Sequence, residues 1–131
     1  MEKTNDILTL ADVKTFVDAF YKKVRQDALL APVFNDKIQD QWHQHLQRMY
    51  SFWQTVLLDE KTYSGNPFQL HAELPVRHTH FKKWLEIFME TVDELFQGEK
   101  AREAKWRAKK IAEMFESKIE YGRNQAFKSV L

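Results

Sequence analysis

The chain has 131 residues, 44% hydrophobic and 30% charged, a length and composition typical of one folded domain and too apolar for a disordered chain. Its 20 basic and 19 acidic residues give a net charge of +1, which excludes the strong positive field that attracts nucleic acids or anionic lipids. The absence of cysteine excludes disulfides, thiolate metal ligands and cysteine nucleophiles.

Residues 1–6 are polar, and the apolar core of a signal peptide does not follow them. No stretch reaches the ~18 apolar residues that a membrane-spanning helix needs. We therefore predict a cytoplasmic protein with no membrane partner and no nucleic-acid partner, in which residues 1–131 form a single domain.

Three glycines and three prolines divide the sequence into long helical runs, and no series of strands is indicated. The first run places apolar residues at helical spacing and opens with Thr9-Leu-Ala-Asp12, a variant of the capping box with Asp in place of Glu. We predict a helix at about 10–26. Residues 28–35 include a proline and are predicted to form a short helical turn that presents Phe34.

The middle of the chain combines a long helix with a short one. The long helix starts near Trp42, has an unusually broad apolar face and ends at Asp59. Residues 63–67 are predicted to form a turn because they include Gly and Pro, and the next segment is predicted to be a short helix that ends before Pro75. This short helix carries His71.

Two further helices complete an all-α prediction. The first begins near Phe81, has a largely aromatic apolar face and is stopped by Gly98. The last places small and bulky apolar residues in register from Ala104 to Ile119 and is predicted to end near Gly122. Periodicity alone does not distinguish a plain bundle from one that encloses a cofactor.

The aromatic residues at helical spacing are mostly expected to form the core. Tyr21 and Trp84 differ, because a buried phenol or indole N–H needs a hydrogen-bond partner and an otherwise apolar face offers few. A bound ligand would provide such a partner. The aromatics predicted to be plain core are Phe16, Phe20, Phe88, Phe96 and Phe115.

Five histidines are the candidate metal ligands. His43 and His45, like His78 and His80, have the spacing His-x-His, which on a helix turns the imidazoles about 200° apart, so neither pair chelates one metal while helical. The Glu-x-x-His motif of di-iron bundles does not occur. His45 and His71 lie on separate elements, as the two sides of a flat cofactor require, and neutral imidazole is a good axial ligand for haem iron. Taken alone, a histidine such as His45 is more often a boundary residue of the core, and one such as His71 a surface loop residue.

Seven short motifs resemble, in order and approximate spacing, those of the group III truncated haemoglobins. The resemblance covers about residues 10–120, and the absence of any Gly-Gly pair also fits that group. It implies a truncated globin fold, a two-on-two helical sandwich around haem b. The motifs are Phe20-Tyr21, Pro32-Val-Phe34, Trp42-His-Gln-His45, Phe52-Trp53, Tyr63-Ser-Gly-Asn-Pro67, His71-Ala-Glu-Leu-Pro75 and His80-Phe-Lys-Lys-Trp84-Leu.

The same resemblance assigns roles to single residues. It makes His71 the proximal ligand of the iron and Phe34 the ring that packs against the haem face. It makes Tyr21, His45 and Trp84 the polar distal residues, with His45 facing either the ligand or the solvent. The other haem contacts that it implies are Met49, Phe52 and Trp53 in the distal wall and Arg77 and His80 at the propionates.

For Arg77, His78 and His80, a solvated side chain is the alternative to a propionate contact. The resemblance further implies a protein that binds dioxygen, nitric oxide, carbon monoxide, cyanide or peroxide. Two distal donors would hold dioxygen too firmly for a carrier, which favours conversion of nitric oxide to nitrate or a peroxidase-like reaction, each supplied by a reductase. The alternatives are an oxygen store or sensor and a haem-free helical interaction module. We expect a monomer or weak dimer.

Overall fold

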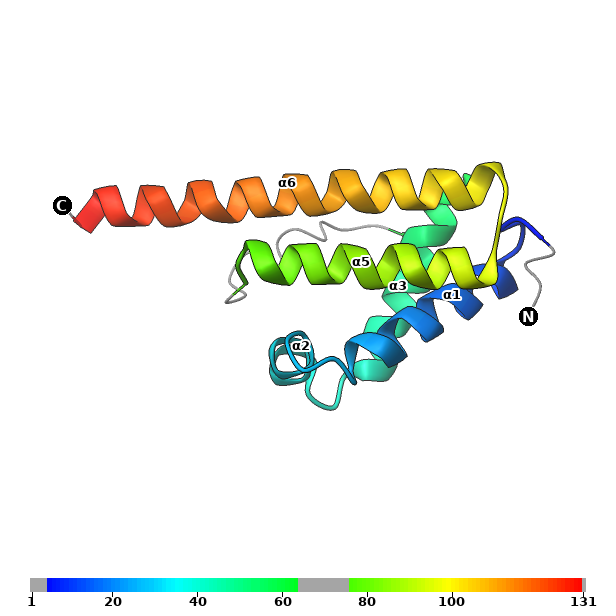
Figure 1. Ribbon diagram of the computed structural model, residues 1–131, viewed down its shortest axis with the longest axis horizontal. Coiled ribbons are helices and arrows are strands. Elements are labelled where there is room, and N and C mark those ends of the chain that lie inside the picture. Colours follow the sequence, from blue (N-terminus) through cyan, green and yellow to red (C-terminus); the bar gives the residue numbers. More distant parts are fainter. Residues whose placement is uncertain (1–4, 64–75, 131) are drawn as a thin grey trace.

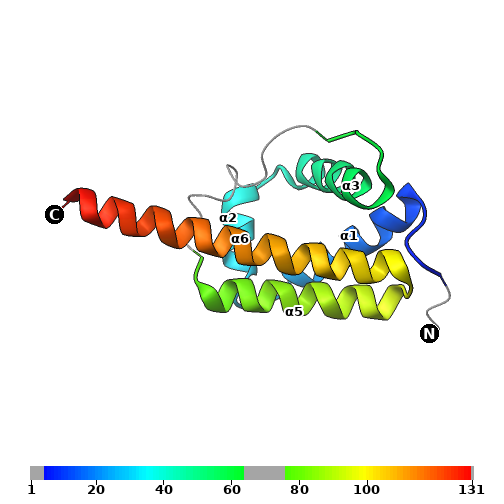
Figure 2. The same cartoon turned by 90° about the horizontal axis from the view of Figure 1, so that it is seen from above.

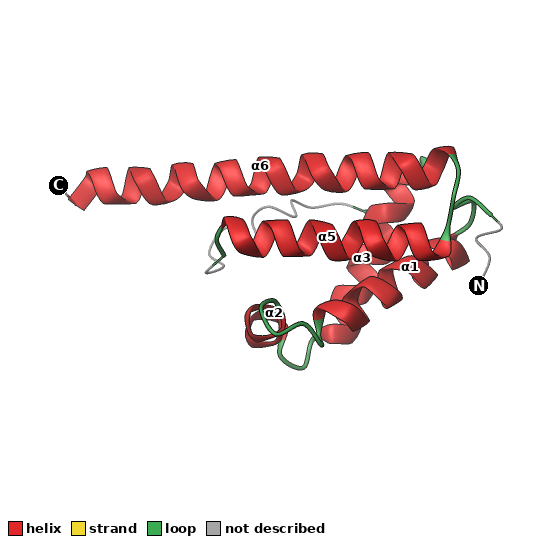
Figure 3. Cartoon of the chain, in the orientation of Figure 1, coloured by secondary structure: helices red, strands yellow, loops and turns green. Residues whose placement is uncertain are grey.

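The computed structural model describes residues 5–63 and 76–130, and in this part of the chain it contains five α-helices and no strand (Figures 1 and 3). The all-α prediction is therefore confirmed. The segment with His71 lies outside the described residues. The helices are α1 (Leu10–Val24), α2 (Ala31–Ile38), α3 (Trp42–Leu58), α5 (His78–Leu95) and α6 (Glu99–Val130).

The four long helices form two pairs that cross one another (Figures 1 and 2). One pair consists of α1 and α3, the other of α5 and α6, and the two helices of each pair run in opposite directions. The pairs are in contact because α1 also packs against α5. The short α2 lies at one end of the first pair (Figure 1). A space between the pairs can thus hold a site whose walls come from both. None of the described helices is long and apolar enough to cross a membrane.

The start of α1 follows the local sequence signal. Thr9 Oγ1 accepts a hydrogen bond from the backbone N–H of Asp12 (3.2 Å), and the Asp12 carboxylate accepts one from the N–H of Thr9 (3.1 Å). The predicted capping box is therefore confirmed. The helix ends at Val24, two residues before its predicted end. Its buried face consists of Val13, Phe16, Val17, Phe20, Tyr21 and Val24.

The ends of α2 and α3 also have local causes. α2 begins at Ala31, later than predicted, because Pro32 fits the first turn of a helix but not its interior. Its Phe34 is buried. α3 ends at Leu58, and Asp59 adopts the left-handed conformation with a φ of 57°, which closes the helix where the sequence predicted.

The turn between α5 and α6 depends on Gly98. Its φ of 129° lies in the region that favours glycine, and a Cβ added there would lie 2.7 Å from Cγ of Asp6. The glycine lets the Asp6 carboxylate accept hydrogen bonds from the N–H groups of Lys100 and Ala101, each at 2.8 Å, at the start of α6. Burial acts to raise the pKa of Asp6, but these bonds and one from Ile7 outweigh it and hold the pKa below its ordinary value.

Gly98→Ala is expected to lower the free energy of unfolding by about 2 kcal/mol, because alanine is strained at this φ and its Cβ would displace Asp6. Urea denaturation followed by circular dichroism measures the change. Gly122→Ala is the matched control, since Gly122 lies within α6 and an added Cβ meets open space there. Alanine at that position should raise stability by up to about 1 kcal/mol. Equal losses in the two variants would contradict the role of Gly98.

The length of α6 differs from the prediction. The helix does not end near Gly122 but continues to Val130. Among the described glycines only Gly98 has a positive φ, so Gly122 keeps a helical backbone. A glycine inside a helix costs only about 1 kcal/mol relative to alanine, which the hydrogen bonds of the helix on both sides offset. Taking this glycine as a stop signal was therefore wrong.

The hydrophobic core lies where the helices pack against one another. The five phenylalanines predicted to be core are all buried, which confirms that prediction. Small residues of α6, namely Ala101, Ala104 and Ala108, are also buried, and they let this helix approach its neighbours closely.

Candidate functional site

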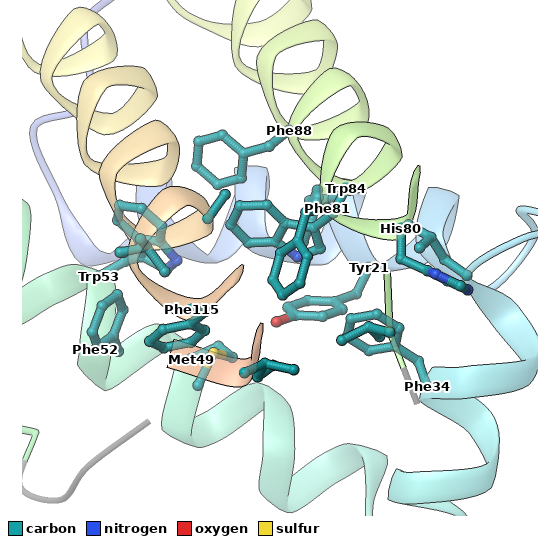
Figure 4. A pocket seen from close by; sticks show the side chains of 16 residues that line it. Tyr21, Phe34, Met49, Phe52, Trp53, His80, Phe81, Trp84, Phe88 and Phe115 are labelled. Carbon is teal, nitrogen blue, oxygen red and sulfur yellow. The ribbon is translucent and has the colours of Figure 1, made fainter. Parts of the chain in front are cut away.

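A cavity lies between the two helix pairs, and sixteen side chains of the described part line it (Figure 4). This central cavity encloses about 80 Å³, within about 850 Å³ of atom-free space that is partly open to solvent. All five helices contribute to its mostly aromatic lining. Seven of the sixteen residues are ones that the sequence singled out: Tyr21, Phe34, Met49, Phe52, Trp53, His80 and Trp84.

Tyr21 supplies a buried donor to the central cavity. The residue lies on the inner face of α1 and is 6% exposed. Its hydroxyl points into the cavity and forms no hydrogen bond with a described residue (Figure 4). Burial raises the pKa of the phenol well above its ordinary value, so the group stays protonated. Because buried hydroxyls normally have a partner, this one is suited to a ligand in the cavity.

Aromatic neighbours hold the ring of Tyr21 in this orientation. It makes edge-to-face contacts with Phe20 and His45, each at 4.9 Å between ring centroids, and with Phe34 at 6.3 Å. Such contacts are the preferred geometry of aromatic pairs. The phenol is therefore positioned by three different elements before any ligand binds: α1, α2 and α3.

Trp84 supplies a second donor, from the opposite helix pair. It is half-buried on α5, packs edge-on against Phe20 (5.5 Å) and stacks on Phe88 (5.7 Å). Its indole N–H forms no hydrogen bond with a described residue. The structure thus brings Tyr21 and Trp84 to one cavity, although 63 positions separate them in the sequence.

His45 is not part of the lining. It is 9% exposed. Its ring packs against that of Tyr21, as described above, and against that of Trp42 at 5.7 Å between ring centroids. Both contacts are edge-to-face. The structure places His45 at neither of the two positions left open by the sequence, because it lies in the interior beside Tyr21, outside the described lining of the cavity and away from solvent.

The wall formed by α3 is apolar. Met49 and Trp53 are buried, and Phe52 packs edge-on against Trp53 at 5.3 Å (Figure 4). Trp53 in turn stacks on Phe88 of α5 at 5.2 Å, so this wall joins the two helix pairs. Phe34 of α2 closes the side of the cavity near Tyr21.

His80 lines the cavity and also caps α5. Its Nδ1 accepts a hydrogen bond from the backbone N–H of Arg77 at 3.0 Å, so the neutral ring carries its proton on Nε2. Arg77 is exposed at the start of α5 and does not line the cavity. His78 is 72% exposed and its Nδ1 lies 2.8 Å from Oε2 of Glu116 on α6. Of the three candidates for a propionate contact, only His80 therefore reaches the cavity.

Of the remaining histidines only His43 belongs to the described part of the chain, and it takes no part in this lining. His43 is exposed. His71, the expected iron ligand, lies outside the described residues. Within the described ranges no three side chains of His, Cys, Asp or Glu are placed to hold a metal ion together.

The sequence did not single out nine of the lining residues. Four of them come from α6, and the spacing of the apolar residues in that helix predicted only that they face the core. Nothing in the periodicity separates a residue that fills the core from one that faces a cavity, because both are apolar. The nine are Phe20, Leu30, Val76, Phe81, Phe88, Ile111, Ala112, Phe115 and Ile119.

These residues fit haem. A porphyrin is large, flat and apolar, and the lining offers aromatic faces from both helix pairs together with a buried phenol that needs a partner. His80, with a proton on Nε2, suits the polar edge of such a group. Because the cavity encloses only about 80 Å³, lining side chains would have to move to admit a macrocycle.

Two crossed helix pairs around an aromatic cavity with inward donors define a globin. Residues 6–118 match the family of bacterial-like globins. The group 3 truncated haemoglobin of Campylobacter jejuni is 32% identical over 115 residues, which are 84% of this chain and 91% of that protein. The crystal structure of the group III truncated haemoglobin from Campylobacter jejuni is similar with a TM-score of 0.81 and 30% identity, and the match covers 90% of this chain and 95% of that one. The chain belongs to the bacterial-like globins, as a truncated haemoglobin of group III.

The family membership confirms the resemblance and the globin fold inferred from the sequence. It also makes the protein a haem-binding globin that binds small diatomic ligands. The match to the family ends at residue 118, so the last part of α6 lies beyond it.

Proposed function

We propose that the central cavity holds haem b, that His71 is the axial ligand of its iron, and that residues 1–131 act as one globin domain. The observation that carries the proposal is the buried Tyr21 hydroxyl, which points into an otherwise apolar cavity. Ferrous haem with one protein ligand supplies an open coordination position, at which dioxygen, nitric oxide, carbon monoxide, cyanide or peroxide binds.

In this proposal Tyr21 and Trp84 donate hydrogen bonds to the ligand, and His45 holds the Tyr21 ring from behind. Bound dioxygen has partial negative charge, so each charge-assisted hydrogen bond contributes about 1.5–3 kcal/mol. Since about 1.4 kcal/mol corresponds to a tenfold change, two donors slow dioxygen release by orders of magnitude. Slow release favours a reaction of dioxygen over its transport.

The reaction that we propose is the oxidation of nitric oxide. One nitric oxide and one dioxygen combine to give one nitrate, with one electron drawn from the ferrous protein and returned by a reductase. The two donors, Tyr21 and Trp84, favour this reaction because they stabilise the negative charge that develops on the oxygen atoms. A cytoplasmic reductase as partner and a monomeric or weakly dimeric state belong to the same proposal.

Nitric oxide mixed with the dioxygen-saturated ferrous protein in a stopped-flow spectrometer should give nitrate and ferric protein rapidly and in equal amounts. The control is the carbon-monoxide-saturated protein without dioxygen, which should give no nitrate. A slow reaction would contradict the proposal and would favour an oxygen store or sensor. A slow reaction together with fast peroxide turnover would instead favour a peroxidase-like function.

A further inference from the structure

A second hollow lies outside the central cavity, between α1 and α3, and is open to solvent. This α1–α3 groove encloses about 390 Å³, near the lower end of the volumes of small-molecule sites. Tyr21 lines both the groove and the central cavity. The other residues of the groove are Trp42, Leu46 and Tyr50 in its floor and Asp18, Lys22, Arg25 and Gln26 at its rim.

The charges of the α1–α3 groove favour an anion. Lys22 and Arg25 are exposed at its rim, and neither forms an ion pair with a described residue. The single acidic group, Asp18, already accepts a hydrogen bond from the hydroxyl of Tyr50. Lys14 adds a further positive charge, 5.6 Å from the centre of the Tyr50 ring. The groove therefore presents two cations that form no ion pair with a described residue, and a carboxylate whose acceptor capacity is partly used.

The geometry of Arg25 favours a carboxylate among anions. Its guanidinium lies over the ring of Trp42, 4.4 Å from the ring centre, which is a cation–π contact. A cation–π contact uses no hydrogen-bond donor of the guanidinium, so its N–H groups can still bind an anion. Two such donors match the two oxygens of a carboxylate.

The floor of the groove favours a flat carbon skeleton. Trp42 and Tyr50 are buried aromatic residues and Leu46 is half-buried, so the polar rim surrounds an apolar base. We propose that the α1–α3 groove binds a small planar carboxylate, with Arg25 and Lys22 on the carboxylate and the aromatic floor under its carbon skeleton.

A ligand in the groove contacts residues that reach the haem site. Trp42 packs against Tyr21 at 5.8 Å and against His45 at 5.7 Å, and Tyr21 itself extends into the central cavity. Occupancy of the groove therefore changes the freedom of the distal phenol and with it the rate at which a haem ligand leaves. By linkage, a haem ligand that orders Tyr21 changes the affinity of the groove by the same factor. This coupling rests on the proposed role of Tyr21, whereas the binding itself does not.

Binding is tested by calorimetric titration of the carbon-monoxide-bound ferrous protein with benzoate, since carbon monoxide keeps benzoate from the iron. Benzoate should bind with one-to-one stoichiometry, and its neutral analogue benzamide should bind at least about tenfold more weakly. Arg25→Gln and Lys22→Gln should each weaken benzoate binding, the first by about tenfold or more. Arg48→Gln, an equal change of charge on the exposed side of α3 outside the groove, is the control and should leave binding unchanged.

Equal binding of benzoate and benzamide, or equal binding by the Arg25→Gln and Arg48→Gln variants, would overturn the site. Coupling is measured as the rate of dioxygen dissociation, by stopped-flow replacement of dioxygen with carbon monoxide, with and without saturating benzoate. The rate should change in the parent protein and in Arg48→Gln but not in Arg25→Gln. Benzoate binding without any change in this rate would overturn the coupling alone.

Discussion

Replacement of His71 by glycine is expected to abolish stable haem binding. Of the described histidines, His43 and His78 are exposed, His45 does not line the central cavity, and Nδ1 of His80 accepts a hydrogen bond from the N–H of Arg77. Without the axial bond, only the apolar contacts of the lining and the polar contact of His80 would retain the porphyrin. The intense near-ultraviolet band of the reconstituted variant should therefore be lost on desalting, and added imidazole should restore it.

His43→Gly is the control for the loss of an imidazole, since His43 is exposed on α3. It should retain haem as the parent protein does. A His71→Gly variant that keeps haem through desalting and shows an ordinary five-coordinate ferrous spectrum would assign the iron ligand to another residue. A parent protein that itself retains no haem would contradict the proposed cofactor altogether.

The helices were predictable where a local signal fixes them. The pair Thr9 and Asp12 fixes the start of α1, and Asp59 fixes the end of α3, through backbone geometry that neighbouring residues determine. Gly122 carried the same kind of signal and was misread, because the cost of one helical glycine is small compared with the stability of a long helix. Local sequence signals therefore predict the end of a helix only where the residues concerned satisfy or interrupt the backbone hydrogen bonds of that helix.

The central cavity was predictable only in part. The polar residues Tyr21 and Trp84 stood out because their donors need partners in an apolar setting, and the structure brings both to the cavity. Phe88 and Phe115 were expected to be plain core, and they are buried, yet they also line the cavity. Whether an apolar side chain contacts another side chain or lines a cavity depends on how the helices cross. The sequence of a single helix does not determine that crossing.

The α1–α3 groove was not predictable for a related reason. Lys22 and Arg25 are ordinary charges on the outer face of a helix in the sequence. Only the approach of α3 places Trp42 under the guanidinium of Arg25 and Tyr50 beside Asp18. The same holds for His80, whose role as a cap of α5 follows from a hydrogen bond to Arg77 and not from its spacing with His78.

Tyr21→Phe is expected to speed dioxygen dissociation by about 10- to 100-fold, because it removes one charge-assisted hydrogen bond of about 1.5–3 kcal/mol. The phenylalanine ring keeps the contacts of Tyr21 with Phe20, Phe34 and His45, so the cavity keeps its shape. Haem retention should be unchanged. The rate is measured by stopped-flow replacement of dioxygen with carbon monoxide, and the C–O stretching frequency of the carbon monoxide form should shift as the donor is lost.

Tyr50→Phe is the matched control, since Tyr50 is also a buried tyrosine but donates to Asp18 outside the central cavity. Its dioxygen dissociation rate should equal that of the parent protein. A faster rate in Tyr21→Phe alone, with haem retained, separates the phenol's action on the ligand from the binding of the cofactor, for which His71 is responsible. An unchanged rate in Tyr21→Phe would instead mean that its hydroxyl does not reach the ligand, and of the two proposed donors only Trp84 would remain.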